Sequence, residues 1–411
     1  MPTTTSSAKT HVAKRGTQWL TRDELEAHLA SLLRIEHAAV FLGSGSSLDI
    51  GGRTMRAAWQ SFKADFPKSH DWLQTQGFVE SGKEPNLEAL LDSVEICRSE
   101  WTRSKHSELP HVEDARADLR RSLIGAATLK REWWTGIPDS DLPLLKSHRA
   151  LLQKFCGARQ PGQAAPWVFT SNYDLAIEWA AESLGLACIN GFSGLHQRRF
   201  SPHNFDLGLR NVLARGEARF GTYCFYLAKL HGSLSWHSKD GAEEVAERAA
   251  SSIWPELADF LDGKSNELAG VMALPGASKY QTTVGFVMGE LFRRFTDFMA
   301  RPQAALFVNG YSFSDAHLNR LLVTALQNPT LQMVVYSPSS SKTSDALLVP
   351  VDRKWLRDIA ALELPQLTIV FGTSDGTFKG MVSHLPDPAI YDEQAAHIRK
   401  MLQEIKGSAS A

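Results

Sequence analysis

The sequence predicts an α/β protein with a Rossmann-like, mostly parallel sheet that carries helices on both faces. The main observation is that short apolar runs of strand length alternate with segments of helical period over most of the 411 residues. Such alternation is typical of parallel strands joined by right-handed crossovers. In addition, 43% of the residues are hydrophobic, which is enough to bury a large core.

The first elements are a helix and a buried strand. Thr21 and Glu24 form a capping box, and Leu25, Leu29 and Leu32 then mark one helix face. The run AAVFL (38–42) ends in a glycine and is typical of a strand that is covered on both sides.

The later elements repeat this alternation. A helix that follows the second strand should end at Gly185, because glycine readily adopts the left-handed conformation of a C-cap. Two further helical patterns cover 316–327 and 352–363. Strands are predicted at 166–170, 186–190, 223–230, 304–310, 331–337 and 367–372.

We expect one domain over residues 21–400. A helical insertion at 67–150 should separate the first two sheet strands, and a charged, Ala-rich segment at 238–268 should form a second insertion. Residues 1–20 and 401–411 are polar and lack periodicity, so both are predicted to be flexible tails.

Charge and hydropathy exclude several classes of protein. The formal net charge is −1, so no global positive field attracts nucleic acid or an anionic membrane. Direct nucleic-acid binding stays open only through FRRF (292–295) and LHQRR (195–199), and solvated helix faces or packing against acidic neighbours explain such stretches most often. No apolar run approaches the roughly 20 residues of a membrane span, and the start lacks a secretory signal. A cytoplasmic protein is expected.

The cysteines do not predict a metal site. A zinc ribbon needs closely spaced pairs of thiolates, and the four cysteines lie 32 or more positions apart. We therefore expect no zinc ribbon and no metal, and we interpret the cysteines as small buried residues. They are Cys97, Cys156, Cys188 and Cys224.

Polar or glycine-rich turns follow four of the predicted strands. Each could be an ordinary turn, because Gly, Ser, Asn and Asp are the usual turn residues. Ligands of open parallel sheets bind at the carboxyl ends of the strands, however, so four such turns at one edge predict a binding site. They are GSGSS (43–47), TSNYD (170–174), HGS (231–233) and GYSFSD (310–315).

The first turn resembles a phosphate-binding loop, in which glycines let backbone N–H groups approach a pyrophosphate. Leu48 stands where a G-x-G-x-x-G fingerprint has its third glycine, and the G-K-[ST] ending of a P-loop is absent. The turn therefore predicts dinucleotide binding with a geometry different from that of a dehydrogenase.

The second and third turns contain candidate catalytic groups. His231 is suited to general base work near neutral pH, although it could merely satisfy a turn carbonyl. Asn172 offers a donor and an acceptor that could orient a ribose hydroxyl or water. Asp174 could support the site or could be only a helix N-cap.

The fourth turn leads into a helix that starts at Ser314 or Asp315. Helix N-termini attract anions and hydroxyl-rich ligands through unpaired N–H groups. For His317 and Asn319, inside the first turns of this helix, a surface role is as plausible as ligand contact.

In their order along residues 36–385, these turns resemble the motifs of the sirtuin catalytic domain. The resemblance implies a sirtuin-like fold that binds and cleaves NAD+, with Asn172 and His231 as the catalytic pair and Asp174 as a supporting residue. It also implies that Gly43, Ser44, Gly45 and Ser46 line the NAD phosphates, that Gly310, Tyr311 and Ser312 face the adenosine, and that Gly372 closes the adenine pocket.

Among sirtuin-like proteins, the stretch 159–236 and FRRF resemble the NADase subunit of the HerA-associated (Nezha) antiphage defence system. This resemblance implies a hexameric HerA-type ATPase as partner and a ring-like homo-oligomer, such as a dodecamer. Protein deacetylation is not expected, because the paired cysteines of the zinc ribbon that shapes the acyl-peptide groove are missing.

The predicted reaction is hydrolysis of the nicotinamide–ribose bond, with NAD+ as substrate, His231 as general base and Asn172 positioning water or ribose. The main alternative is a module that senses NAD or a related nucleotide and regulates a partner without cleavage. ADP-ribosyl transfer would need an acceptor groove, and a nuclease would need clustered metal-binding carboxylates; neither is evident in the sequence.

Overall fold

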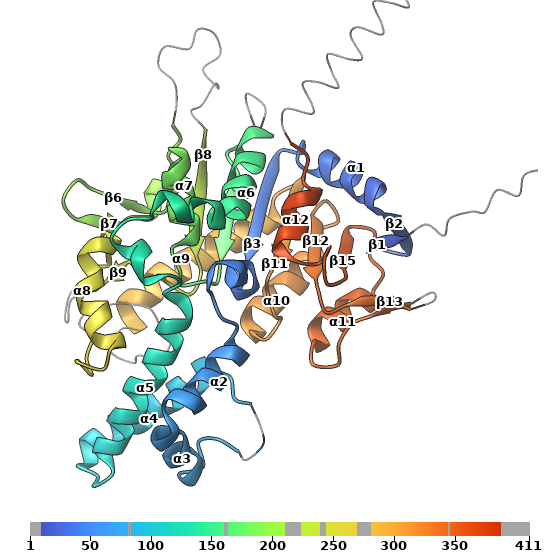
Figure 1. The fold of residues 1–411 in the computed structure, drawn as a ribbon. Helices are drawn as coiled ribbons and strands as arrows, with labels where there is room; N and C mark the ends of the chain where they lie inside the picture. Colours follow the sequence, from blue (N-terminus) through green and yellow to red (C-terminus); the bar gives the residue numbers. More distant parts are fainter. Residues whose placement is uncertain are drawn as a thin grey trace, which may run out of the picture.

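A nine-stranded sheet forms the centre of the protein in the computed structural model (Figure 1). The model describes residues 10–80, 82, 84–159, 163–209, 223–238, 244–268, 281–343 and 346–387. In sheet order, the strands are β2 (Gln18–Thr21), β1 (His11–Arg15), β15 (Leu367–Phe371), β12 (Gln332–Ser337), β11 (Ala304–Asn309), β3 (His37–Leu42), β4 (Trp167–Thr170), β8 (Cys224–Lys229) and β5 (Ala187–Ile189). From β15 to β5 all neighbours pair in parallel, so the predicted mostly parallel α/β sheet is confirmed.

Helices cover both faces of this sheet because side chains alternate between the faces along each strand. In β3, Val40 belongs to one buried cluster and Phe41 to the other. The helices on the Val40 face are α1 (Arg22–Leu32), α6 (Lys146–Gly157), α7 (Ala176–Leu184) and α12 (Phe378–His384). Those on the Phe41 face are α9 (Gln281–Ala300), α10 (Ala316–Ala325) and α11 (Lys354–Ala361).

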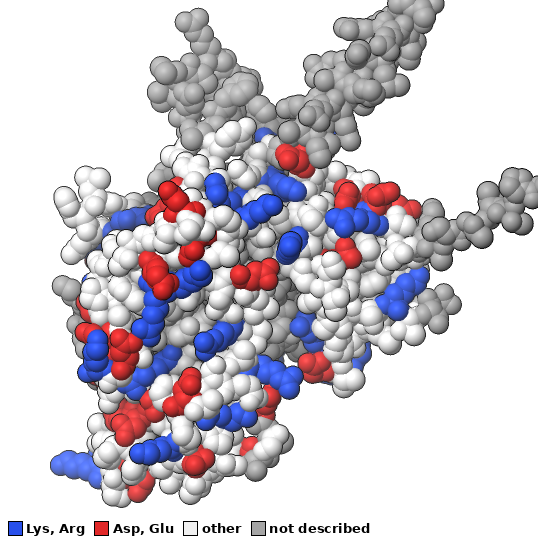
Figure 2. Space-filling view, in the orientation of Figure 1, with Lys and Arg blue, Asp and Glu red and all other residues white. Residues whose placement is uncertain are grey.

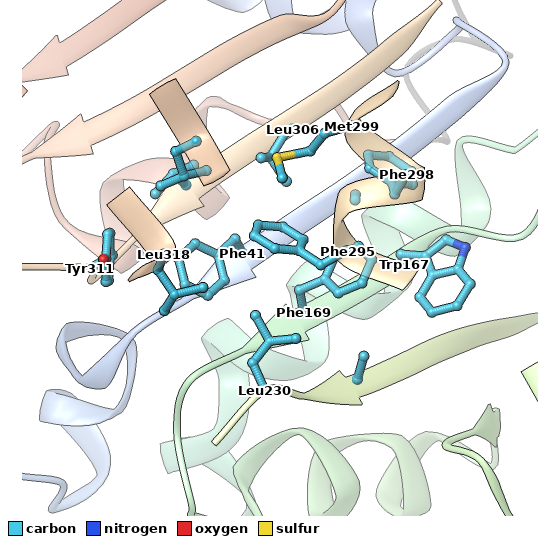
Figure 3. Close-up of a cluster of buried hydrophobic side chains, with 14 of the residues drawn as sticks. Phe41, Trp167, Phe169, Leu230, Phe295, Phe298, Met299, Leu306, Tyr311 and Leu318 are labelled. Atoms are coloured by element: carbon cyan, nitrogen blue, oxygen red, sulfur yellow. The ribbon is translucent and has the colours of Figure 1, made fainter. Parts of the chain in front are cut away.

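Aromatic packing holds α9 against the sheet (Figure 3). The ring of Phe295 lies 5.3 Å from that of Phe41 and 4.8 Å from that of Phe169, between centroids. Phe298 packs beside them at 5.7 Å from Phe169. Aromatic pairs at these separations stabilise a core beyond the area that they bury.

Local signals in the sequence set several element ends as predicted. Thr21 accepts a hydrogen bond from the backbone N–H of Glu24 and completes the capping box of α1. Gly185 ends α7 in the left-handed conformation, with φ of 63°. The predicted strands and the helices at 316–327 and 352–363 are present, with shifts of up to two residues at their ends.

The predicted N-terminal tail of residues 1–20 is wrong for its second half. Residues His11–Arg15 and Gln18–Thr21 form an antiparallel hairpin, and β1 also pairs antiparallel with β15. These strands are short and mix polar with apolar residues, so their pattern alone did not reveal them. Residues 1–9 and the predicted tail at 401–411 lie outside the described residues.

The segment between β3 and β4 is helical and has a hydrophobic cluster of its own. Its helices are α2 (Met55–Asp65), α3 (Pro67–Thr75), α4 (Leu87–Ser104) and α5 (Leu109–Ala127), followed by the short helices η2 (Arg131–Trp134) and η3 (Asp139–Leu145). Trp59 and Phe62 of α2 pack in the same cluster as Leu91 and Leu119, so α2 belongs with this group. Figure 1 shows α2 to α5 projecting from the sheet; we call these four helices the helical insertion.

A smaller sheet was not predicted. It has the order β6 (Phe192–Ser193), β7 (Arg198–Phe200), β10 (Ala246–Glu247) and β9 (Trp236–His237), and helix α8 (Ala250–Leu261) follows it. β10 and α8 lie within the predicted second insertion, of which residues 239–243 are outside the described part. A separate two-stranded hairpin consists of β13 (Ser341–Thr343) and β14 (Ala346–Leu348).

Positive and negative side chains are interspersed on the face shown in Figure 2. The basic stretches of the sequence are paired with acids: Arg294 contacts Asp206 and Glu290, and Arg198 contacts Glu247. This pairing supports packing against acidic neighbours rather than a nucleic-acid contact. Within the described part of the chain, every helix is too short or too polar to cross a membrane.

Candidate active site at the carboxyl edge of the sheet

The four predicted turns meet at one cavity. Strands β11, β3, β4 and β8 are neighbours in the sheet, and the turns that follow them line a cavity of about 460 Å³. The predicted site residues in its lining are Gly43, Ser44, Asn172, Asp174, His231, Gly310, Tyr311 and Ser312. Gly45 and Ser46 are in the first turn but not in the lining, and Gly372 follows β15, which β12 separates from β11.

The first and fourth turns are locked together through their glycines. The N–H of Gly45 donates to the carbonyl of Gly310 at 2.9 Å, and the N–H of Gly43 donates to that of Asn309 at 2.9 Å. A Cβ atom on Gly43 would lie 2.5 Å from the carbonyl oxygen of Gly310, so only glycine permits this approach. The N–H of Ser46 also donates within the turn, to Gly43 at 2.9 Å. A phosphate could use these three N–H groups only by sharing or breaking existing bonds.

Asn172 is oriented by the first turn. Its side-chain amide donates to the carbonyl of Gly43 at 3.1 Å and lies 3.3 Å and 3.2 Å from the hydroxyls of Ser46 and Ser47. Its backbone N–H donates to the hydroxyl of Thr170 at 3.0 Å. These contacts hold the amide at the cavity wall, with 9% of the residue exposed.

Asp174 lies one residue before Leu175, the N-cap of α7, so it is not the N-cap itself. Its carboxylate accepts a hydrogen bond from the hydroxyl of Ser47 at 2.7 Å, and it also accepts one from the backbone N–H of Ala176 at the start of α7, at 3.1 Å. Burial raises the pKa of Asp174, against the opposing effects of Lys229 and the hydrogen bond from Ser47. Asp174 therefore joins the first turn, the second turn and α7.

Lys229 supports the second turn, and the sequence did not predict this role. Its buried ammonium group donates to the carbonyl oxygens of Tyr173 and Asp174 at 3.4 and 2.5 Å and to the carboxylate of Glu178 at 2.8 Å. These hydrogen bonds hold the backbone of the second turn against strand β8. The signal was a lysine in an otherwise apolar strand, YLAKL, two residues before His231.

His231 lies between two carboxylates. Its Nε2 is 3.1 Å from Oδ2 of Asp315, and its Nδ1 is 4.0 Å from Oε1 of Glu88. The rings of Tyr173 and Phe292 flank the imidazole, each with a centroid separation of 6.4 Å.

Asp315 also begins the helix α10. Its Oδ1 accepts hydrogen bonds from the backbone N–H groups of His317 and Leu318, at 2.7 and 3.0 Å. Burial acts to raise the pKa of Asp315, but the interaction with His231 and the backbone hydrogen bonds from Leu318 and His317 oppose it, and the net result is a lowered pKa. The prediction that the helix starts at Ser314 or Asp315 is confirmed, with Asp315 as N-cap.

The helical insertion provides a wall of the cavity that the sequence did not predict. Asn86, Glu88 and Asp92, around and on α4, line it. Glu88 accepts a hydrogen bond from the hydroxyl of Tyr173 at 2.6 Å. Burial, with the nearby charges of Glu88 and Glu95, raises the pKa of Asp92. The sequence contained a weak signal for this wall. Like charges four residues apart destabilise a helix, and Glu88 and Asp92 have this spacing on α4.

Tyr311 lines the cavity, and its hydroxyl is bonded to the buried Asn319. The hydroxyl of Tyr311 donates to the side-chain oxygen of Asn319 at 2.8 Å, and the amide of Asn319 donates to the carbonyl of Phe313 at 2.9 Å. Asn319 is only 1% exposed, so the surface role considered for it is wrong. The exposed His317 packs its ring edge-on against Phe292, at 4.9 Å between centroids.

Among the described residues, no group of histidine, cysteine or acidic side chains has the arrangement to hold a metal ion. The cysteines are free thiols; Cys156 and Cys224 are buried, as predicted, whereas Cys97 and Cys188 are half-buried.

The fold and the site together define an α/β protein with a ligand-sized cavity at the carboxyl edge of its parallel sheet. Residues 166–349 match the family model described as a SIR2-like domain. This match includes three of the four turns, those with Asn172, His231 and Gly310. It confirms the sirtuin side of the predicted resemblance. No curated protein matches the sequence.

Two solved structures illustrate the likeness to Sir2 proteins. One is a Sir2 homologue in complex with NAD, at 13% identity and a TM-score of 0.40, covering 91% of this chain and 97% of the other. Another is a mutant Sir2 homologue with 2′-O-acetyl-ADP-ribose, at 12% identity and a TM-score of 0.40, covering 88% and 96%. Because the sequence identities and the TM-scores of both structures are low, nothing about the chemistry of this chain follows from them.

Proposed function

We propose that this protein hydrolyses the nicotinamide–ribose bond of NAD+ and releases nicotinamide and ADP-ribose. The observation that supports this most is the convergence of Asn172 and His231 on one cavity at the carboxyl edge of the sheet, inside the segment that matches a SIR2-like domain. The cavity of about 460 Å³ is within the range of small-molecule sites.

The chemistry needs few groups. The bond to be cleaved joins ribose to a cationic ring, which leaves as neutral nicotinamide, so no acid has to protonate it. A water oxygen bonds to the ribose carbon, the electron pair of the broken bond goes to nicotinamide, and His231 accepts the proton of the water. Positive charge develops on the ribose during cleavage, as in other glycosyl transfers. The carboxylates of Glu88 and Asp315, which line the cavity, favour that charge.

The remaining roles follow the sirtuin resemblance. Asn172, held by the first turn, would position the water or a ribose hydroxyl. Residues 43–46 would lie along the phosphates, where Ser44 has a place in the cavity lining. Residues 310–312 would face the adenosine. Gly372 would close the adenine pocket, at a position outside this cavity.

The test is nicotinamide release from NAD+ by the purified protein. His231→Ala should lower turnover by roughly 10² to 10⁴-fold, the range of general base catalysis, while NAD+ binding persists. The matched control is His106→Ala, because His106 stacks on Trp101 at 4.1 Å and is not in the cavity lining. Full activity of His231→Ala would refute the catalytic assignment.

The second candidate is a module that binds NAD+ and regulates a partner without cleaving it. The locked contacts between the first and fourth turns favour a cavity of fixed shape, which suits binding as well as catalysis. Tight NAD+ binding without nicotinamide release, by the protein alone and with its partner, would establish this alternative.

We also propose the antiphage role, the HerA-type ATPase partner and the ring-like homo-oligomer, on the sequence resemblance. Light scattering of the protein alone would test the oligomer. Co-purification with a HerA-type ATPase would test the partner, and NAD+ consumption in infected cells would test the role. If the protein is a monomer in solution, the proposed ring-like homo-oligomer is refuted. If no ATPase co-purifies with it, the proposed partnership is refuted.

A further inference from the structure

Asp315 has two separate hydrogen-bonding tasks in this structure. One carboxylate oxygen, Oδ1, accepts the backbone N–H groups of His317 and Leu318 at 2.7 and 3.0 Å and caps α10. The other, Oδ2, lies 3.1 Å from Nε2 of His231. The helix cap therefore fixes the direction in which the second oxygen meets the imidazole.

This geometry restricts the tautomer of His231. An ionised carboxylate only accepts hydrogen bonds, so the imidazole nitrogen facing Asp315 has to carry a hydrogen. In neutral histidine one nitrogen carries the hydrogen and the other has a free electron pair. A hydrogen on Nε2 leaves Nδ1 as the basic nitrogen.

Nδ1 faces the helical insertion across the cavity. Its distance of 4.0 Å from Oε1 of Glu88 is too long for a direct hydrogen bond. Glu88 is held in place by the hydroxyl of Tyr173 at 2.6 Å, and both residues line the cavity. A negative charge at this distance stabilises an imidazolium without occupying the electron pair of Nδ1.

Resting on the proposed function, we propose that Asp315 is a positioning residue that keeps the hydrogen of neutral His231 on Nε2, so that Nδ1 accepts the proton during NAD+ cleavage. The proton comes from the attacking water, whose oxygen bonds to the ribose carbon. The imidazolium that forms keeps its Nε2 hydrogen, which it shares in a hydrogen bond with Asp315, while its protonated Nδ1 faces Glu88. It then returns the Nδ1 proton to solvent.

The test separates the helix cap from the charge. Asp315→Asn keeps an N-cap oxygen, because Asn is as good an N-cap as Asp, but it removes the negative charge beside His231. We expect kcat for NAD+ cleavage to fall about 10- to 100-fold with little change in KM. The control is Thr21→Ala, which removes the N-cap of α1 outside the cavity and should lower only thermal stability.

A pH profile distinguishes positioning from a structural effect. The titratable groups that face His231 in the described structure are Asp315 from the start of α10, Glu88 from α4 and Tyr173 from the turn after β4. Loss of either carboxylate removes a negative charge that favours the imidazolium, so Asp315→Asn and Glu88→Gln should both move the acid limb of the kcat profile to lower pH. An unmoved limb in Asp315→Asn, with a loss of activity no larger than that of Thr21→Ala, would overturn the proposal.

A second measurement does not depend on catalysis. With ¹⁵N-labelled histidine, NMR spectra recorded above about pH 8, where an ordinary imidazole is neutral, report which nitrogen carries the hydrogen. The signal of His231 is identified by its absence in His231→Ala. We expect the Nε2–H tautomer in the wild-type protein. In Asp315→Asn, where the amide oxygen keeps the helix cap and the donating amide NH2 faces Nε2, we expect the Nδ1–H tautomer instead. The Nδ1–H tautomer in the wild-type protein would overturn the proposal, whether or not NAD+ is cleaved. The Nε2–H tautomer without nicotinamide release would refute the hydrolysis alone and leave the assignment of Asp315 to the tautomer intact.

Discussion

Replacement of Gly310 by alanine should destabilise the protein through the contact between the first and fourth turns. Gly310 has φ of +69°, and a Cβ there would lie 2.4 Å from the backbone nitrogen of Ser46. The left-handed conformation alone costs a non-glycine residue about 1–2 kcal/mol. Backbone atoms cannot rotate away as a flexible side chain can, so overpacking adds about 1–3 kcal/mol. The expected total loss is about 2–5 kcal/mol in the free energy of unfolding.

Gly185 provides a matched control for this prediction. Its φ of +63° is almost the same, and a Cβ there would meet nothing within 4 Å. Gly185→Ala should therefore show only the conformational part of the loss, about 1–2 kcal/mol. Urea unfolding of the two variants and the wild-type protein measures the difference. Equal losses in both variants would refute the idea that the two turns are locked by backbone contact.

Three further predictions concern titration and the contact between the insertion and the sheet. Burial lowers the pKa of His148 from 6.5 to about 4. As the pH drops, the unfolded chain therefore protonates at His148 before the folded protein does. The free energy of unfolding falls between pH 6.5 and pH 4, by about 2 kcal/mol at about pH 5. In His148→Leu, urea unfolding at a series of pH values should show a flatter profile in this range. The pKa of Asp315 is lowered instead. Its contribution to the free energy of unfolding is therefore complete at pH values above 3.8, its ordinary pKa, and disappears as the pH falls through its pKa in the folded protein. Acid unfolding of Asp315→Asn should lack this contribution. Tyr173→Phe should lower the free energy of unfolding by about 1.5–3 kcal/mol, because it removes a hydrogen bond to the carboxylate of Glu88. A double-mutant cycle with Glu88→Ala that shows no coupling would contradict this.

Local patterns were sufficient for most of the sheet. The runs that end at Leu42, Thr170 and Asn309 are buried on both faces, so their continuous apolar character was visible without any knowledge of their partners. The edge hairpin of β1 and β2 was missed because its strands have only five and four residues, although Val12, Ala13 and Leu20 pack in a buried cluster. The strands of the smaller sheet, with two or three residues each, are too short for a periodic pattern.

The candidate site was predictable to the extent that it follows the strand ends. Asn172, Asp174 and His231 come directly after the strands β4 and β8, and a parallel sheet brings such positions to one edge. Glu88 could not be found in this way, because it lies on a helix of the insertion more than eighty residues before its partner Tyr173. Its hydrophobic neighbours on α4 describe only an amphipathic helix.

The sequence by itself determined the α/β class, the main strands in their order along the chain and the four turns. These features depend on periodicity and on residues that are close along the chain. The tertiary structure alone decided which charges meet. Asp315 is an N-cap by local rules, but its second carboxylate oxygen faces His231 only because β8 and β11 end at the same edge of the sheet. Contacts between residues far apart along the chain depend on how the elements pack, and no local pattern records that packing.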